Sequence, residues 1–172
     1  IQGWIKGVNS TGKTPDKDMG ADGHATGLNK TFAPDAFSYS LNYYNNDYIA
    51  NVDAFVNPQN TGFENPQLFN GNIRSMTTSI NEIDEGDVFG AQYRYDQLNR
   101  IKSMKGYYGF DKSNNFWGTN TSQGAYDCNY SYDPMGNISH LSRSQRNGQS
   151  LDEFNYNYNQ GTNQLNHVVD NI

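Results

Sequence analysis

YRYDQLNRI at residues 93–101 and YSYDPMGNI at residues 130–138 share one pattern, and this pattern decides the fold. In each stretch, two tyrosines separated by one residue are followed by an aspartate, two variable residues, an asparagine or glycine, a polar residue and an isoleucine. Side chains alternate along a β-strand, so both tyrosines fall on one face. The aspartate and the asparagine or glycine three residues later favour a type I turn that ends in a left-handed residue. Each stretch therefore predicts a β-hairpin.

The residues of these two stretches are expected to have structural rather than catalytic roles. The aspartate can accept backbone N–H groups inside its turn, and the left-handed residue is cheapest as glycine or asparagine. A degenerate third copy lies at residues 156–165, and residues 69–73 preserve the end of another. One hairpin is marginal alone, so such units must pair edge to edge. The motif residues are Tyr93, Tyr95, Asp96, Asn99, Arg100 and Ile101, and then Tyr130, Tyr132, Asp133, Gly136, Asn137 and Ile138.

Alternation of period two recurs along most of the chain. Residues 36–44 place Phe37, Tyr39, Leu41 and Tyr43 on one face of a strand, opposite a run of Ser and Asn. Residues 49–56 could form a short helix. Asn70-Gly71 and Asn147-Gly148 are candidates for two-residue type I′ turns, in which both residues have positive φ. These patterns predict an all-β fold, a curved antiparallel sheet of consecutive hairpins.

Composition limits the size and the partners of this fold. The 172 residues suit one domain, with upstream strands and loops over residues 1–88 and repeats over residues 89–172. A net charge of −6 repels phosphate backbones and anionic lipid, which argues against nucleic acid as a partner. No apolar run approaches the roughly 18 residues of a membrane span, so membrane insertion is not expected. The chain opens without Met or a signal peptide, and we interpret it as a piece of a longer protein.

On these motifs the chain resembles the YD-repeat, or Rhs-repeat, family of large bacterial proteins, whose signature is a Tyr-x-Tyr-Asp-x-x-Gly-Arg-Leu type motif. Residues 4–9, 33–45 and 69–76 also look like the segment that precedes the last repeats in one group of the family. Asn99, Asn137 and Asn159 depart from the usual Gly, Arg and Asp. The family's shell-closing segment, with its self-cleaving aspartate chemistry, has no match in this sequence.

The resemblance implies a segment of a β-sheet shell, secreted or at the bacterial cell surface. Such a shell encloses or displays a variable C-terminal toxin or effector, so the expected partners are the remainder of the parent chain and this cargo. The segment would be non-enzymatic and need no cofactor. Unpaired strands at its ends would let the isolated piece self-associate through its sheet edges.

Carbohydrate binding is the alternative function. Flat aromatic rings can stack on sugar rings, and asparagine side chains offer paired donors and acceptors. The candidate residues are Trp4, Trp117, Tyr107 and Tyr108. Packing between strands is the competing explanation for the aromatic residues, and glycans are therefore a possible rather than a required partner.

Other chemistry has weaker support. The histidines are scattered without metal-binding spacing, and Cys128 has no basic neighbour in the sequence that would activate it, so we expect no metal site and an inert buried thiol. Residues 18–29 follow a calcium-loop pattern loosely, but Asn29 cannot supply the bidentate carboxylate of the last position. The acidic cluster of Glu82, Asp84, Glu85 and Asp87 could supply the paired carboxylates of a glycosidase, although such charge runs are usually solvated.

Overall fold

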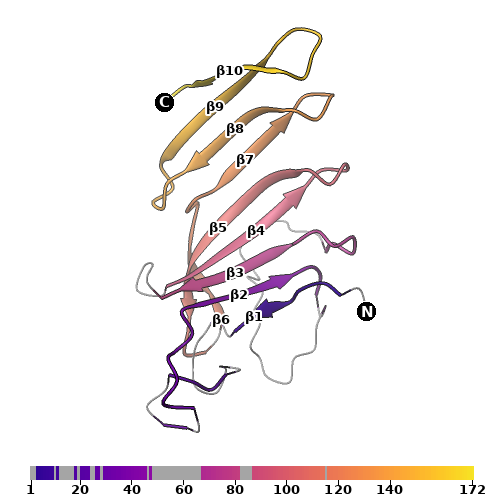
Figure 1. Ribbon diagram of the computed structural model, residues 1–172. Helices are drawn as coiled ribbons and strands as arrows, with labels where there is room; N and C mark the ends of the chain where they lie inside the picture. Colours follow the sequence, from indigo (N-terminus) through magenta and orange to yellow (C-terminus); the bar gives the residue numbers. More distant parts are fainter. Residues whose placement is uncertain are drawn as a thin grey trace. The chain divides into compact units, whose positions relative to one another are not determined.

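The computed structural model of the chain describes residues 3–9, 11, 18, 20–23, 26–27, 29–45, 47, 67–81, 87–114 and 116–172 (Figure 1). These residues form strands and turns and contain no helix, which confirms the all-β class. The short helix expected at residues 49–56 lies outside the described residues, as do His24, Glu82 and Glu85. Within the same described residues, no helix has the length and apolar character that crossing a bilayer requires.

The strands follow the chain order with one exception. The order in the sheet is β1-β2-β3-β4-β5-β7-β8-β9-β10, and β6 pairs with β5 beside this path. The path forms a nine-strand antiparallel sheet. The strands are β1 (Gly7–Val8), β2 (Phe37–Asn42), β3 (Ser75–Ile80), β4 (Val88–Tyr95), β5 (Ile101–Asp111), β6 (Phe116–Gln123), β7 (Cys128–Tyr132), β8 (Ile138–Ser144), β9 (Ser150–Tyr158) and β10 (Leu165–Asp170).

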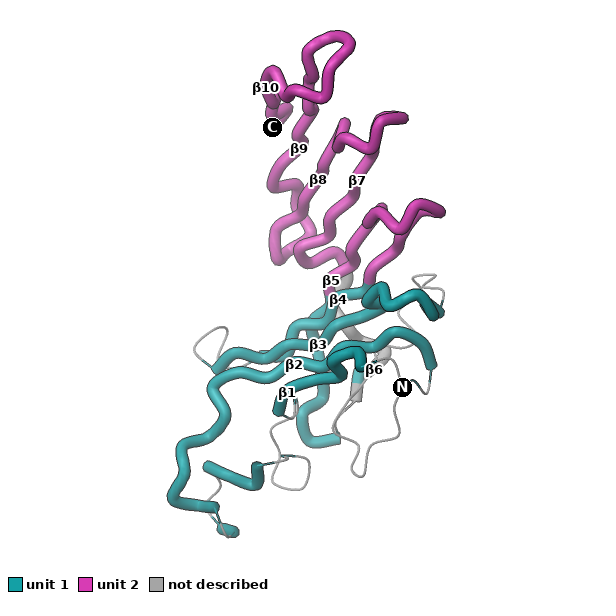
Figure 2. The backbone as a smooth tube through the Cα atoms, turned by 45° about the vertical axis from the view of Figure 1, so that its right-hand side comes forward, with its two compact units in different colours: residues 1–92, 107–122 teal, residues 93–106, 123–172 magenta. Residues whose placement is uncertain are grey.

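The chain divides into two compact units (Figure 2). Unit 1 comprises residues 1–92 and 107–122, and unit 2 comprises residues 93–106 and 123–172. Strands β4 and β5 contribute residues to both units, so the division does not follow the chain at a single point. The expectation of one domain, with upstream strands and loops over residues 1–88 and repeats over residues 89–172, stays a prediction.

In unit 1, the buried face of the sheet is the one that carries small polar side chains. Ser40 of β2 lies opposite Thr77 of β3, and Thr77 lies opposite Gly90 of β4. Ser40 and Thr77 are fully buried, whereas Phe37, at the start of β2, is largely exposed. Small side chains in this row leave space for large aromatic side chains to pack on the sheet. The serine positions of β2 are therefore the covered ones.

The aromatic core of unit 1 packs on Gly90. A Cβ atom at Gly90 would lie 2.6 Å from a ring carbon of Trp117, so only glycine fits beneath this indole. The Phe110 and Trp117 rings meet edge to face with their centroids 5.1 Å apart, an arrangement that adds to the stabilisation from burial. Val88 and Tyr107 complete this core cluster.

Unit 2 consists of antiparallel strands with mostly half-exposed side chains. Tyr130 of β7 lies opposite Leu141 of β8, which lies opposite Phe154 of β9, so these apolar side chains share one face. Polar pairs also join neighbouring strands. His140 Nε2 lies 2.5 Å from Glu153 Oε1. Every residue of β10 is exposed.

Candidate functional site

The two aspartate turns have the same backbone geometry. The Asp96 N–H donates to the Arg100 carbonyl at 2.9 Å, and the Asn99 N–H donates to the Asp96 carbonyl at 3.0 Å. The second turn repeats both bonds, because the Asp133 N–H donates to the Asn137 carbonyl at 2.9 Å and the Gly136 N–H donates to the Asp133 carbonyl at 3.1 Å. The turns therefore close as five-residue loops.

The predicted left-handed residues are present in both turns. Asn99 has φ of 62° and Gly136 has φ of 93°. Glycine adopts this region without strain, and asparagine does so more easily than other residues with a side chain. Asn99 therefore supports the same turn in the first motif that Gly136 supports in the second.

The carboxylate of Asp96 closes the first turn from inside. Its Oδ1 accepts the N–H groups of Leu98 at 2.9 Å and of Arg100 at 3.0 Å, and its Oδ2 accepts Arg100 Nε at 2.7 Å. Burial opposes ionisation of Asp96, but these hydrogen bonds dominate and lower its pKa below the ordinary aspartate value. These three contacts all lie within the turn, so the Asp96 carboxylate caps its own turn.

Asp133 makes the matching contacts with an uncharged partner. Its Oδ1 accepts the Asn137 N–H at 2.9 Å, and its Oδ2 accepts the Asn137 side-chain amide at 2.9 Å. The hydrogen bond from this side chain is the main reason that the pKa of Asp133 is also lowered. Asn137 thus takes the place that Arg100 has in the first turn, although one is neutral and the other charged.

The third copy forms a longer turn. The Asn159 N–H donates to the Gln164 carbonyl at 2.9 Å, one residue further along than in the other two turns. Gly161 supplies the positive φ, at 75°. The side chain of Asn159 accepts a hydrogen bond from Asn166 at 2.8 Å, so this turn has no carboxylate at its centre. The departure of the third copy from the motif is therefore also a departure in structure.

The Asn147-Gly148 turn differs from its prediction. Gly148 has φ of 79°, but Asn147 is not among the residues with positive φ, so the predicted type I′ turn is wrong. The same holds for Asn70-Gly71, where Gly71 has φ of 89° and Asn70 does not have positive φ. The Gly148 N–H donates to the Gln145 carbonyl at 3.0 Å, and the Gln145 N–H donates to the Gln149 carbonyl at 2.7 Å. This loop therefore has the five-residue form of the aspartate turns.

Tyrosine hydroxyl groups connect each hairpin of unit 2 to the preceding strand. The Tyr132 hydroxyl donates to the Ile101 carbonyl at 2.7 Å, and the Tyr158 hydroxyl donates to the Ile138 carbonyl at 2.8 Å. In both pairs the tyrosine is the second of its Tyr-x-Tyr pair, and the isoleucine is the last residue of the preceding motif. The repeat therefore extends beyond the turns to the contacts between neighbouring strands.

A third contact of this kind lies in unit 1. The Tyr43 hydroxyl donates to the Ile5 carbonyl at 2.8 Å. Tyr43 follows β2, and Ile5 precedes the neighbouring strand β1. The Trp4 ring lies against Tyr43 with 4.8 Å between centroids. The segment at residues 4–9 thus has the same relation to β2 as the return strands of unit 2 have to their neighbours.

Arg100 joins the first turn to the second hairpin. Besides binding the Asp96 carboxylate, its guanidinium lies over the Tyr132 ring, 4.4 Å from the centroid. A cation over an aromatic face is attracted by the ring quadrupole, by roughly 0.5–1 kcal/mol at exposed sites. Arg100 therefore contributes to the turn of its own motif and to the packing of the next one.

The aromatic residues considered for sugar binding occupy two environments. Tyr107 and Trp117 are only 2% exposed, and the Tyr107 hydroxyl donates to Gln92 at 3.1 Å. Rings buried to this extent offer no face for stacking on a sugar. Trp4 and Tyr108 are half-buried, so the carbohydrate hypothesis depends on these two residues.

The remaining chemical candidates have structural contacts. Burial raises the pKa of the half-buried Cys128 thiol, which favours the unreactive form. Carboxylate oxygens of Asp18, Asp22 and Asp35 lie within 4.8 Å of one another, but the Asp18 carboxylate caps its own loop through the N–H groups of Gly20 and Asp22 at 3.1 and 3.0 Å. An acidic cluster of this kind is not by itself evidence of a cation site.

Comparison of the chain with protein-family models, curated proteins and solved structures finds no match. The functional interpretation therefore depends on the contacts inside the chain. The most informative of these contacts are the two carboxylate-closed turns and the three tyrosine-to-carbonyl hydrogen bonds.

Proposed function

We propose that this chain is a non-enzymatic segment of a YD-repeat shell, which encloses or displays a toxin or effector segment of its parent protein. The bacterial cell surface or the secreted fraction is the location that fits such a shell. Its partners would be the remainder of the parent chain and the cargo at its C-terminal end.

The proposal rests on one observation above all: the same tyrosine-to-carbonyl contact recurs from hairpin to hairpin. Tyr132 bonds to Ile101 and Tyr158 bonds to Ile138, each at the same place in the motif. A module that binds its predecessor in the same way each time can be extended without new contacts, as in other repeat proteins. Extension by repetition is the property that a long enclosing sheet requires.

The contacts of the motif residues also support a structural role. The Asp96 and Asp133 carboxylates accept hydrogen bonds from their own turns, and these bonds lower the pKa of both groups. A general acid at neutral pH needs a raised pKa instead. Both carboxylates are thus suited to holding a turn rather than to acting as a general acid.

The proposal can be tested in the parent protein. We expect the reading frame around the codons for residues 1–172 to encode further Tyr-x-Tyr-Asp motifs, and a C-terminal segment of the parent to resist protease. Opening two turns with Asp96→Ala and Asp133→Ala should make this segment sensitive, while Gln97→Ala, in the same turn but at a variable position, should leave it protected. A parent that has no further motifs, or whose C-terminal segment is digested equally in all variants, would contradict the proposal.

Self-association belongs to the same proposal. Strand β10 ends the path of the sheet, and its residues are exposed. Unpaired strand edges promote pairing between molecules. We expect the isolated chain to form larger species as its concentration rises, measured by light scattering, and a strictly monomeric chain at high concentration would count against this part of the proposal.

A further inference from the structure

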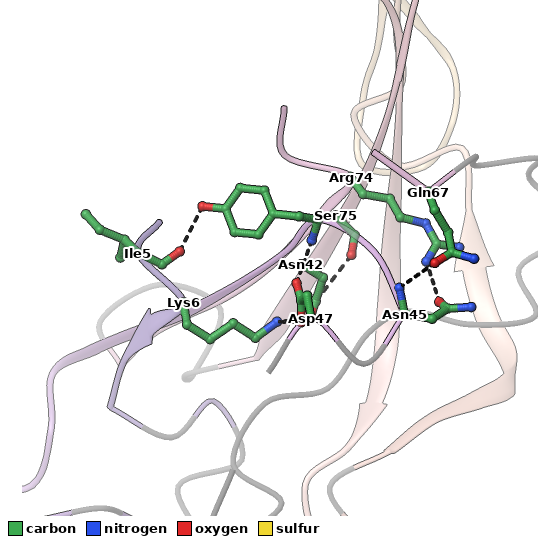
Figure 3. A network of polar contacts seen from close by, with 9 residues as sticks. Ile5, Lys6, Asn42, Asn45, Asp47, Gln67, Arg74 and Ser75 are labelled. Carbon is green, nitrogen blue, oxygen red and sulfur yellow. Dashed lines mark hydrogen bonds and ion pairs between the residues drawn. The ribbon is translucent and has the colours of Figure 1, made fainter. Parts of the chain in front are cut away.

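Lys6, Asn42 and Asp47 meet in unit 1, away from the repeat turns. The Lys6 ammonium nitrogen lies 2.6 Å from Asn42 Oδ1 and 2.7 Å from Asp47 Oδ1. Figure 3 shows the Lys6 side chain extending toward the other two residues. An amine, a carboxamide and a carboxylate are thus in direct contact, although Lys6 and Asn42 are 36 residues apart in the chain.

Backbone hydrogen bonds fix the positions of Lys6 and Asn42 in the chain. The Leu41 N–H donates to the Lys6 carbonyl at 2.7 Å, which places Lys6 beside the end of β2. Asn42 is held on its other side, because its carbonyl accepts the Arg74 N–H at 2.8 Å and its side-chain nitrogen lies 3.3 Å from Ser75 Oγ. The backbone bond therefore holds Lys6 beside Leu41, the residue before Asn42, and the lysine side chain extends from there to the carboxamide.

Asp47 is positioned independently of Lys6. Its second oxygen, Oδ2, accepts the Tyr43 N–H at 2.8 Å, so Oδ1 remains directed at the lysine. The Asp47 side chain is 8% exposed and the Lys6 side chain 15%. Asn42 belongs to the buried serine face of β2. All three groups are thus largely removed from water.

Burial prepares the lysine for reaction. Desolvation lowers the pKa of Lys6, although the hydrogen bond and charge of Asp47 act in the opposite direction. A desolvated lysine transfers its proton to a neighbouring carboxylate more readily than an exposed one, and a neutral amine is a nucleophile. Groups held in contact also react far faster than the same groups free in solution.

We propose that Lys6 and Asn42 join through an intramolecular isopeptide bond, with Asp47 as the group that transfers the protons. Asp47 takes a proton from the Lys6 ammonium, and the neutral amine attacks the Asn42 side-chain carbonyl carbon. A new C–N bond forms and the carbonyl becomes tetrahedral. The protonated Asp47 then gives its proton to the original amide nitrogen, the C–N bond to that nitrogen breaks, and ammonia leaves. The ammonia takes the second proton of the attacking lysine nitrogen and departs as ammonium, which leaves a neutral secondary amide.

The atoms and charges of this reaction balance without a further reagent. A lysine ammonium and an asparagine carboxamide become one secondary amide and one ammonium ion, and Asp47 returns to its carboxylate form. No oxidation or reduction takes place. The reaction happens once per molecule, so it modifies the chain without making it an enzyme. The isopeptide proposal does not depend on the proposed shell function.

The bond would secure the shortest strand of the sheet. Strand β1 has two residues and pairs with β2 at the end of the strand path. Few backbone hydrogen bonds hold so short a strand, and an end strand is the first part of a sheet to open. A covalent link from Lys6 to Asn42 would keep β1 and β2 together when these hydrogen bonds break.

Mass spectrometry of the purified chain tests the proposal. We expect the intact mass to be lower than the sequence mass by one ammonia, trypsin not to cut after Lys6, and tandem spectra to show a branched peptide that joins Lys6 to Asn42. Hydroxylamine should not remove the link, whereas it would cleave a succinimide formed at Asn70-Gly71 or Asn147-Gly148. A folded chain at the full sequence mass that trypsin cuts after Lys6 would overturn the proposal.

Variants separate the three roles. Lys6→Arg keeps a cation beside Asp47 but removes the amine, and Asn42→Ala removes the carboxamide, so both should stay at their sequence mass. Asp47→Ala should also stay unlinked, with folding checked by circular dichroism. Asn45→Ala is the matched control and should still lose one ammonia, because Asn45 contacts Arg74 at 2.6 Å and not the lysine. Full linkage in Asp47→Ala would overturn the proton-transfer role.

Discussion

The hydroxyl of Tyr132 donates a 2.7 Å hydrogen bond to the carbonyl of Ile101, which lies 31 residues earlier in the chain. The bond joins the end of β7 to the start of β5, two neighbouring strands of the sheet. Tyr158 and Ile138 repeat this relation on β9 and β8. A single residue type thus connects consecutive repeats at equivalent positions.

Removal of these hydroxyl groups should weaken unit 2. We expect Tyr132→Phe and Tyr158→Phe each to lower the free energy of unfolding by about 0.5–1.5 kcal/mol, the usual net contribution of one hydrogen bond. Urea unfolding followed by tyrosine fluorescence measures this change. Tyr156→Phe is the matched control, since this tyrosine shares the strand with Tyr158 and its hydroxyl has no hydrogen bond within the described part of the chain. Equal stability of all three variants and the wild type would contradict the role of the hydroxyl groups.

The aspartate turns should make stability depend on pH in the acid range. The pKa values of Asp96 and Asp133 are lowered in the folded chain, so the folded state binds fewer protons than the unfolded state. Their contribution is therefore complete above the ordinary aspartate pKa of about 4 and is lost as the pH falls through the lower folded values. Thermal unfolding across this range should show a smaller acid loss for Asp96→Asn with Asp133→Asn than for the wild type. An unchanged acid loss would exclude this role.

The turns could be predicted from the sequence because their determinants are local. A left-handed residue at Asn99 or Gly136 and an aspartate three residues before it are enough to specify the loop. The tyrosine-to-carbonyl bonds could not be predicted, because they depend on which strands become neighbours and in what register. The alternation of residues in the third copy likewise predicted its strand but not the additional residue of its turn.

Burial was harder to predict than strand position. The pattern of residues 36–44 contains two possible faces, and hydropathy favours the aromatic one as the core. The structure covers Ser38 and Ser40 instead, on the same face of the sheet as Gly90, where Trp117 from a later part of the chain packs. The contact of Lys6 with Asn42 and Asp47 is equally long-range, and no spacing rule within the sequence indicates it.

Gly90 should not tolerate a larger residue. A Cβ atom there would lie within 2.6 Å of the Trp117 ring, so Gly90→Ala forces the indole to move and should destabilise unit 1 by about 1–3 kcal/mol. Trp117→Phe alone should also destabilise it, by leaving a cavity. The double variant should cost less than the two single changes together, because the smaller ring makes room for the methyl group. If the changes in the free energy of unfolding are strictly additive in chemical unfolding, residue 90 and the Trp117 ring are not in steric contact.

Substitution of Gly136 tests whether the turn requires a left-handed backbone conformation, without a steric clash that would also lower stability. Its φ of 93° disfavours residues with a side chain, yet the nearest atom to an added Cβ is Arg100 Nη1 at 3.8 Å, so there is space for one. Gly136→Val should therefore lower the free energy of unfolding by about 1 kcal/mol or more through strain alone. Gly136→Asn should cost less, since Asn99 adopts the corresponding conformation in the first turn. If both variants melt at the wild-type temperature, the left-handed turn does not form in solution.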